Sequence, residues 1–193
     1  SEADAIMRAM VNRQPGDADR VYAYGLYLSG NNQDEMALAQ INALPRGQWT
    51  DNIRELEARL QSDNVLRQAN QLRDSGQEAR AIALINQQPT SVRYALTLAD
   101  WAQQRGDSQT AIAEYQRVLG QQPDNGDARL GLAEVYLADG DKNAARAQVA
   151  QLKGEDIDSI NMQRRIAQAQ AGLGDRAQAQ QTLARIVPQA KAQ

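Results

Sequence analysis

Three acidic residues that stand close together, Glu155, Asp156 and Asp158, form the first group in this sequence that could do chemistry. Two carboxylates can act as a general acid and a general base, and a set of three can bind a cation. The group lies between two segments with helical periodicity, and carboxylates also collect at helix starts because the helix dipole favours negative charge there. We therefore interpret these three residues as structural.

A glycine-rich stretch, GLGDR at 172–176, is the second such group, because glycine loops can hold phosphate. It follows a segment with helical rather than strand periodicity, so we do not predict a phosphate loop. The chain has no histidine and no cysteine, which removes disulfides, thiolate and imidazole catalysis, and the usual ligands of zinc, copper and haem. The sequence predicts no catalytic residue, no metal, no cofactor and no enzyme activity.

The composition is typical of a helical protein without a single large core. Only 4% of the 193 residues are aromatic, and Ala, Leu, Gln and Arg, which favour helices, are frequent. The 21 basic and 24 acidic residues include no basic block, which disfavours nucleic acid as a partner. Apolar runs such as AIALI at 81–85 are far shorter than the roughly 20 residues of a membrane-spanning helix, so no transmembrane segment is predicted.

A period of 34 residues organises the sequence, because Gly106, Gly140 and Gly174 follow one another at this interval. Apolar residues recur at helical spacing on both sides of each glycine, so each period predicts two antiparallel helices. Small residues mark the places where these helices cross closely: Gly25, Ala69, Ala99, Ala133 and Ala167 in the first helices, and Ala3, Ala37, Ala81, Ala111, Ala145 and Ala179 in the second helices.

The turn inside each predicted pair has its own signature. The glycine lies where the first helix ends and the chain needs a positive φ, and Asn32 takes this place in one unit. The aspartate that follows three of the glycines, Asp107, Asp141 or Asp175, is a good first residue for the next helix.

One interval is longer than the others. Ala37 and Ala81 are 44 residues apart, which leaves room for the additional segment DNIRELEARLQ. We predict an extra unpaired helix near 51–61, and the sequence leaves open whether it is continuous with the next helix. The predicted organisation is that of a fragment of a longer array: a second helix and one repeat over 1–49, an inserted helix over 50–61, and four further repeats over 62–193.

The aromatic residues divide into two groups. Trp101, Tyr27 and Tyr136 fall at helix positions that face neighbouring helices, so we interpret them as packing residues. Trp49 lies in a loop beside the additional segment. It can cover that segment or stay exposed for a partner, and the sequence favours neither alternative.

A helix pair that repeats every 34 residues, with Pro15 and Pro123 after second helices, resembles the tetratricopeptide repeat. The resemblance implies an all-α, right-handed superhelical solenoid whose concave groove is lined by the first helices. The candidate groove residues that it implies are Tyr22, Leu66, Asn70, Arg73, Arg93, Leu96, Asp100, Gln104, Leu130, Glu134, Arg164 and Gln168. Leu66, Leu96 and Leu130 would form an apolar line along this groove.

Three long stretches, RVYAYGLYLSGN, RYALTLADWAQQRGDSQTAIAEYQRVL and DARLGLAEVYLADGDKNAARAQVAQLKG, resemble the periplasmic repeat region of the cellulose synthase operon C family, the bacterial outer-membrane cellulose exporters. The resemblance implies a non-catalytic periplasmic scaffold and guide in cellulose export, with the full-length protein in the outer membrane. It implies as partners the cellulose synthase complex, other periplasmic proteins of the cellulose system, the outer-membrane barrel of the same polypeptide and, as a further candidate, the glucan chain. The alternative is a generic adaptor whose groove binds a peptide and no glucan.

Overall fold

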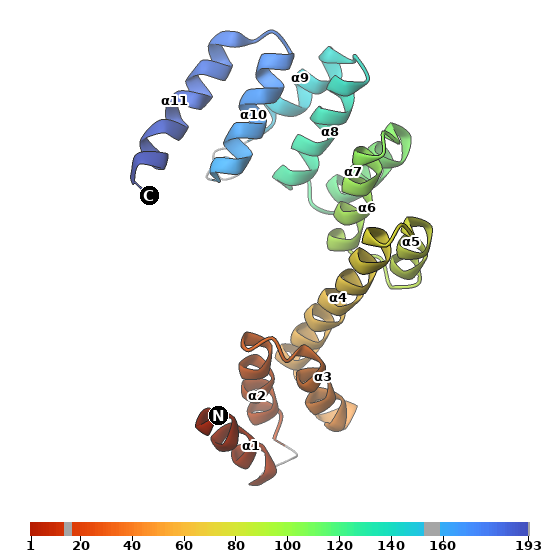
Figure 1. The fold of residues 1–193 in the computed structure, drawn as a ribbon, viewed down its shortest axis with the longest axis vertical. Helices are drawn as coiled ribbons and strands as arrows, with labels where there is room; N and C mark the ends of the chain where they lie inside the picture. Colours follow the sequence, from red (N-terminus) through yellow and green to blue (C-terminus); the bar gives the residue numbers. More distant parts are fainter. Residues whose placement is uncertain (14–16, 153–158, 193) are drawn as a thin grey trace. The chain divides into compact units, whose positions relative to one another are not determined.

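A computed structural model describes residues 1–13, 17–152 and 159–192 of the chain. Within these ranges every regular element is a helix, which confirms the predicted all-α class (Figure 1). The chain divides into two compact units, Ser1–Gln88 and Pro89–Gln193. Each unit contains a hydrophobic core of its own.

The helices of both units follow one another in antiparallel pairs. The described part of the N-terminal unit contains α1 (Glu2–Arg13), α2 (Ala18–Gly30), α3 (Asp34–Ala43), the 3-10 helix η1 (Arg46–Gln48), α4 (Asp51–Asp74) and α5 (Glu78–Asn86). The C-terminal unit contains α6 (Val92–Gln104), α7 (Ser108–Gln121), α8 (Gly126–Ala138), α9 (Lys142–Ala150), α10 (Ile160–Gly172) and α11 (Arg176–Ala192). The packed pairs are α2 with α3, α4 with α5, α6 with α7, α8 with α9, and α10 with α11.

The turns inside these pairs use positive φ angles, as the sequence predicts. Asn32 has a φ of 60° in the turn between α2 and α3. The glycines at the matching places have φ angles from 78° to 84°: Gly76, Gly106, Gly140 and Gly174. The stretch GLGDR is therefore a helix-to-helix turn, as its position after a helical segment indicates.

The turn between α6 and α7 shows how little chain such a turn needs. The Asp107 amide donates to the Ala102 carbonyl at 2.8 Å and the Gly106 amide donates to the Gln103 carbonyl at 3.2 Å, which is the Schellman pattern at a helix end. The Asp107 carboxylate then accepts a hydrogen bond from the Thr110 amide at 3.2 Å. Asp107 therefore both closes α6 and caps α7.

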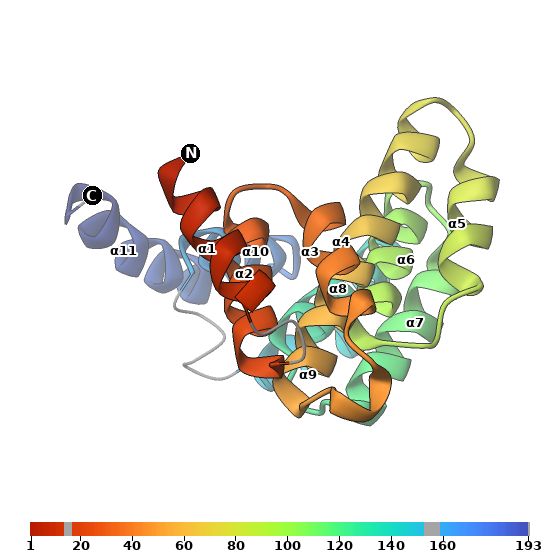
Figure 2. The same ribbon diagram turned by 90° about the horizontal axis from the view of Figure 1, so that it is seen from below.

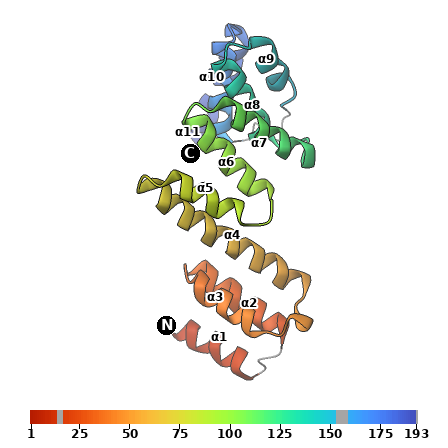
Figure 3. The same ribbon diagram turned by 90° about the vertical axis from the view of Figure 1, so that its right-hand side faces the viewer.

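The additional segment predicted over 51–61 is helical, but it is not a separate helix. α4 runs without a break from Asp51 to Asp74, because no glycine or proline interrupts this stretch. The open question of continuity is thus answered, and the separate inserted helix over 50–61 is corrected to the first half of α4. The segment is also not unpaired, since α4 contacts both α2 and α3 (Figure 3).

The two halves of α4 bury different faces. The buried side chains are Ile53, Leu56 and Leu60 in the first half, and Val65, Leu66 and Ala69 in the second half. At 3.6 residues per turn, the mean directions of these two sets differ by roughly 170° around the helix axis. The first half packs in the core of α2 and α3, and the second half pairs with α5, which returns beside it (Figure 2).

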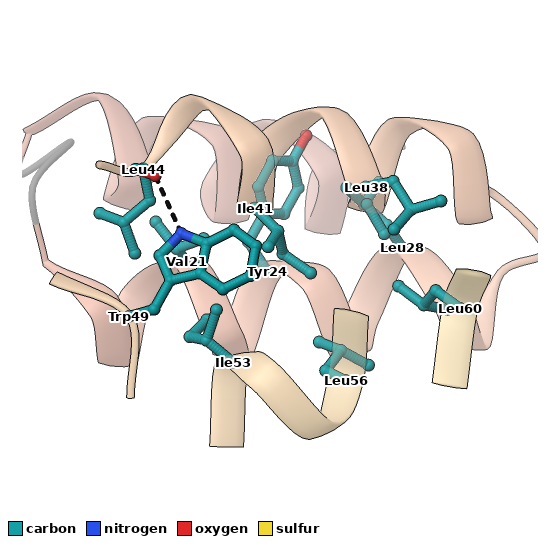
Figure 4. Close-up of a cluster of buried hydrophobic side chains, with 11 residues drawn as sticks. Val21, Tyr24, Leu28, Leu38, Ile41, Leu44, Trp49, Ile53, Leu56 and Leu60 are labelled. Carbon is teal, nitrogen blue, oxygen red and sulfur yellow. Dashed lines mark hydrogen bonds between the residues drawn. The ribbon is translucent and has the colours of Figure 1, made fainter. Parts of the chain in front are cut away.

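Trp49 completes the core of the N-terminal unit. Its side chain is only 9% exposed, and its Nε1 donates to the Leu44 carbonyl at 2.9 Å (Figure 4). The Arg46 guanidinium lies 4.8 Å from the centre of its ring, a cation–π distance. Of the two alternatives for Trp49, the structure shows the covering role, in the same core as Ile53 from the additional segment.

The small residues predicted at helix crossings are buried in the C-terminal unit. Ala99, Ala111 and Ala133 are fully buried and Ala145 is 1% exposed. The aromatic residues interpreted as packing residues also contact the cores: Trp101 is buried, and Tyr27 and Tyr136 are partly buried against their units' cores. These observations confirm the register of the repeat in the C-terminal unit. In the N-terminal unit the predicted crossing residues are buried with the exception of Ala3, which is exposed on α1, so the prediction of a close crossing there is wrong.

The acidic residues Glu155, Asp156 and Asp158 lie outside the described residues, so their structural interpretation stays a prediction. Elsewhere in the described ranges, no group of three or more acidic residues is arranged to hold a metal ion. None of the described helices is long and apolar enough to cross a membrane.

Candidate interaction surface

The candidate groove residues of the C-terminal unit lie on the first helices of its pairs, α6, α8 and α10. α8 contacts both α6 and α10, so these helices form one layer (Figure 1). We call the exposed and half-buried polar candidates on this layer the first-helix surface: Arg93, Asp100, Gln104, Glu134, Arg164 and Gln168. Asp100, Glu134 and Gln168 occupy the same place in three successive repeats.

The two carboxylates of the first-helix surface are held by neighbouring side chains. Gln104 Nε2 donates to Asp100 Oδ2 at 2.8 Å along α6. Glu134 on α8 forms an ion pair with Arg165 on α10 through both carboxylate oxygens. Arg165 was not identified from the sequence. The signal for this residue was a basic side chain on the first helix of the following repeat, where it can reach the Glu134 carboxylate of the preceding repeat.

Tyr115 on α7 contacts α6, one of the helices that carry the first-helix surface. Its hydroxyl donates to Gln103 Oε1 at 2.8 Å, which connects α7 to α6. Burial raises the pKa of Tyr115 to about 12, and the nearby carboxylates of Asp100 and Glu134 act in the same direction. The phenol therefore stays protonated at neutral pH and keeps its proton for Gln103.

The ring of Tyr115 fits only because residue 131 on α8 is a glycine. A Cβ atom at Gly131 would lie 2.3 Å from Tyr115 Cζ. Tyr115 was not among the residues that the sequence connected to the candidate surface. The glycine on the facing helix was the signal of this close approach.

The apolar line predicted along the groove is wrong for two of its three leucines. Leu130 is fully buried and Leu66 is 8% exposed, so neither can offer an apolar contact to a ligand. Leu96 is partly buried and packs against the core of the C-terminal unit. Burial of leucine side chains at these positions stabilises the fold. The part of the first-helix surface that a ligand can reach is consequently polar.

The candidates in the N-terminal unit are more scattered. Tyr22 on α2 is partly buried and packs against the unit's core, while Asn70 on α4 is exposed. Arg73 at the end of α4 pairs with Glu78 Oε1 of α5 at 3.3 Å. Leu26, one turn after Tyr22, is 39% exposed and is therefore more accessible than Tyr22.

The comparisons with known proteins fit this arrangement of helix pairs. A tetratricopeptide repeat family model matches residues 102–164, which cover the end of α6 to the first turn of α10. This part of the chain resembles the tetratricopeptide repeat. A solved structure of MamA from Desulfovibrio magneticus RS-1 shares the fold, with a TM-score of 0.56 and 12% identity over 91% of this chain and 96% of MamA. The predicted solenoid of tetratricopeptide helix pairs is confirmed.

Curated relatives with far higher identity carry the name cellulose synthase operon protein C. The protein of that name from Salmonella typhimurium (strain LT2) is 59% identical over 119 residues, which are 62% of this chain and 10% of the relative. The protein from Escherichia coli (strain K12) is 60% identical over 119 residues, with the same coverage. The resemblance to this protein is therefore confirmed, and the chain spans about a tenth of the length of these relatives.

Proposed function

We propose that this chain is a non-catalytic periplasmic scaffold and guide in bacterial cellulose biosynthesis and export, which links the inner-membrane synthase to the outer-membrane pore. The observation that carries the proposal is the identity of about 60% to cellulose synthase operon protein C over 119 residues. The tetratricopeptide fold supports it, because this fold typically serves protein interaction rather than catalysis.

The chemistry of the first-helix surface suits an uncharged polymer or a neutral protein partner. Arg93 and Arg164 bring two positive charges, Asp100 brings one negative charge, and Glu134 is already paired with Arg165. The charges thus nearly balance, so the surface does not select for a strongly charged ligand. The amides of Gln104 and Gln168 can donate to and accept from the hydroxyls of a glucan.

The absence of catalysis rests on the residue types. Without histidine or cysteine, a reaction would require a carboxylate pair in an enclosed pocket. The two carboxylates of the first-helix surface are instead held by Gln104 and Arg165 on an open layer of helices. We therefore propose that the surface binds and positions its partner without transforming it.

The similarity to cellulose synthase operon protein C supports a proposal for the partners and the compartment. We propose that the chain lies in the periplasm, in a full-length protein of the outer membrane that includes the export barrel. Its partners there are the cellulose synthase complex and other periplasmic proteins of the cellulose system, with the glucan chain as a direct ligand of the first-helix surface.

A generic adaptor that binds a peptide and no glucan is the second candidate. The match to the tetratricopeptide family favours it independently of the cellulose relatives. The amides and balanced charges of the first-helix surface can pair with a peptide main chain as well as with sugar hydroxyls. Binding measurements separate the two candidates directly.

The test combines binding with secretion. Titration of the purified chain with cellohexaose is expected to show saturable binding, and the double variant Gln104→Ala/Gln168→Ala is expected to weaken it. The matched control is Gln116→Ala/Gln180→Ala, which removes two exposed amides from the second helices α7 and α11. In the full-length exporter, secreted cellulose should fall for the first variant and not for the control.

Two results would change the proposal. If cellohexaose does not bind while periplasmic proteins of the cellulose system are captured by the chain, the adaptor candidate replaces glucan guidance. If both double variants secrete as much cellulose as the unchanged exporter, the first-helix surface has no role in export.

A further inference from the structure

A pocket lies within the C-terminal unit, away from the first-helix surface. It has a volume of about 540 Å³ and opens between α9 and α11, at the end of α10. This volume is within the range of roughly 300–1,000 Å³ of small-ligand pockets. None of the candidate groove residues lines it, so the role proposed above does not explain it.

The pocket contains more hydrogen-bond donors than acceptors that are still available. Arg146 donates through Nε to Asp175 Oδ2 and through Nη2 to the Leu173 carbonyl, both at 3.2 Å, which fixes the guanidinium and leaves Nη1 without an acceptor among the described residues. Arg185 on α11 makes no hydrogen bond or ion pair with the described residues. Asp175, the one carboxylate among the described lining residues, is already engaged by Arg146.

A hydroxyl–amide contact orients a third donor. Thr182 Oγ1 lies 2.8 Å from Gln170 Oε1 and 3.0 Å from the Gln178 carbonyl oxygen, and its single proton is shared between these two acceptors. Gln170 Nε2 donates to no acceptor among the described residues and is left for a ligand. Two guanidinium groups and an amide nitrogen therefore face one pocket whose described lining contains no carboxylate that is not already paired. Guanidinium groups bind carboxylates in pairs of parallel hydrogen bonds, so an anionic, acceptor-rich ligand is favoured.

The remaining lining indicates a polypeptide rather than a small anion or a sugar. Val149 provides apolar contact beside the arginines, and Gln178 and Gln181 add amides that can pair with main-chain groups. A pocket of this volume is much larger than a single carboxylate group needs. None of the lining residues that the structure describes has an aromatic ring on which a sugar could stack.

We propose that this pocket binds an extended polypeptide segment through a carboxylate side chain, with Arg146 and Arg185 as its anchors. The pocket gives the chain a second, acidic-peptide site on its second helices, separate from the near-neutral first-helix surface. The two sites can therefore be occupied at the same time.

The experiment uses a short fluorescein-labelled peptide of alternating alanine and glutamate as the probe, followed by fluorescence anisotropy. Saturable binding is expected, with backbone amide NMR shifts confined to α9, the end of α10 and α11. Arg185→Gln should weaken binding about tenfold, because it removes one charge-assisted hydrogen-bonding group from an exposed residue. Arg176→Gln, on the same helix but outside the lining, is the matched control and should leave the affinity nearly unchanged.

Three results would overturn the proposal. The first is no saturable binding of the alanine–glutamate peptide. The second is equal binding of an alanine–glutamine peptide, which would show that the carboxylate is not recognised. The third is equal weakening by Arg185→Gln and Arg176→Gln, which would show attraction by net charge rather than by this pocket.

Discussion

Replacing Gly131 by alanine tests whether the contact between α7 and α8 is as close as the structure shows. A methyl group at this position would lie 2.3 Å from Tyr115 Cζ and 2.5 Å from its hydroxyl oxygen, well inside van der Waals contact. The ring cannot move freely, because Tyr115 is 4% exposed and its hydroxyl is bonded to Gln103. We therefore expect Gly131→Ala to destabilise the chain.

The magnitude follows from three opposing contributions. Alanine in a helix interior gains about 1 kcal/mol over glycine in intrinsic propensity. Overpacking a close contact costs about 1–3 kcal/mol, and displacing the ring loses a hydrogen bond with a net contribution of about 1 kcal/mol. The expected net loss of unfolding free energy is thus about 1–3 kcal/mol, opposite in sign to the propensity effect.

Gly120→Ala is the matched control for this experiment. Gly120 also lies in a helix of the C-terminal unit, but a methyl group there would meet no atom within 4 Å. Only the propensity gain remains, so Gly120→Ala should be neutral or slightly stabilising. Urea unfolding followed by circular dichroism measures both variants, and amide hydrogen exchange locates the weakened helices.

A double-mutant cycle with Tyr115→Ala identifies the cause of the effect. Without the ring, Gly131→Ala should become neutral or stabilising, so the two substitutions should be strongly coupled. If Gly131→Ala alone leaves the urea midpoint unchanged or raises it, the reasoning about this contact is refuted.

Three further predictions concern packing and caps. Ala145→Leu should lower stability by about 1–3 kcal/mol because Ala145 is buried at a helix crossing, whereas Glu134→Leu on the first-helix surface should be much milder; equal unfolding midpoints would contradict the register. Trp49→Phe should cost about 1 kcal/mol through its lost main-chain hydrogen bond, with the loss seen in hydrogen exchange of α3 and α4. Hydrogen bonds from the Thr110 side chain and amide lower the pKa of Asp107. The stabilising effect of the Asp107 carboxylate should therefore be complete above its unfolded-state pKa and disappear as the pH falls through its folded-state pKa. Asp107→Asn should remove this acid dependence from the unfolding curves.

The sequence predicts the helix pairs well because their signals are local. Glycine or asparagine at a positive φ, followed by a capping aspartate, determines where one helix ends and the next begins, as at Gly106 and Asp107. Small residues at a fixed distance from these turns then identify the buried faces, as Ala99 and Ala133 show.

The continuity of α4 was not predictable from spacing alone. An interval with extra residues fits both an inserted helix and an extended one, and Ser62 and Asp63 are acceptable both as caps and as interior helix residues. The choice depends on whether both halves can bury an apolar face without breaking the helix, which requires knowledge of the packing partners.

The candidate surface was predictable in position but only partly in accessibility. Helical periodicity places Leu130 and Asp100 on first helices, but it does not show how far neighbouring helices cover each side chain. Leu130 is fully buried, whereas Asp100 is exposed. The same limit applies to Arg165 and Tyr115, whose roles depend on contacts between successive repeats.

Because the two halves of α4 bury opposite faces, the length of this helix determines the angle between those faces. Each residue added to or removed from its middle would rotate one face relative to the other by about 100°, while a change of seven residues would rotate it by only about 20° and shift it by about 10 Å along the axis. Length changes between the two faces should therefore be tolerated in steps near whole numbers of turns, and single-residue deletions between Leu60 and Val65 should be far more damaging than substitutions there. Changes of whole turns can thus vary the distance between the two packing faces of α4 and preserve the angle between them.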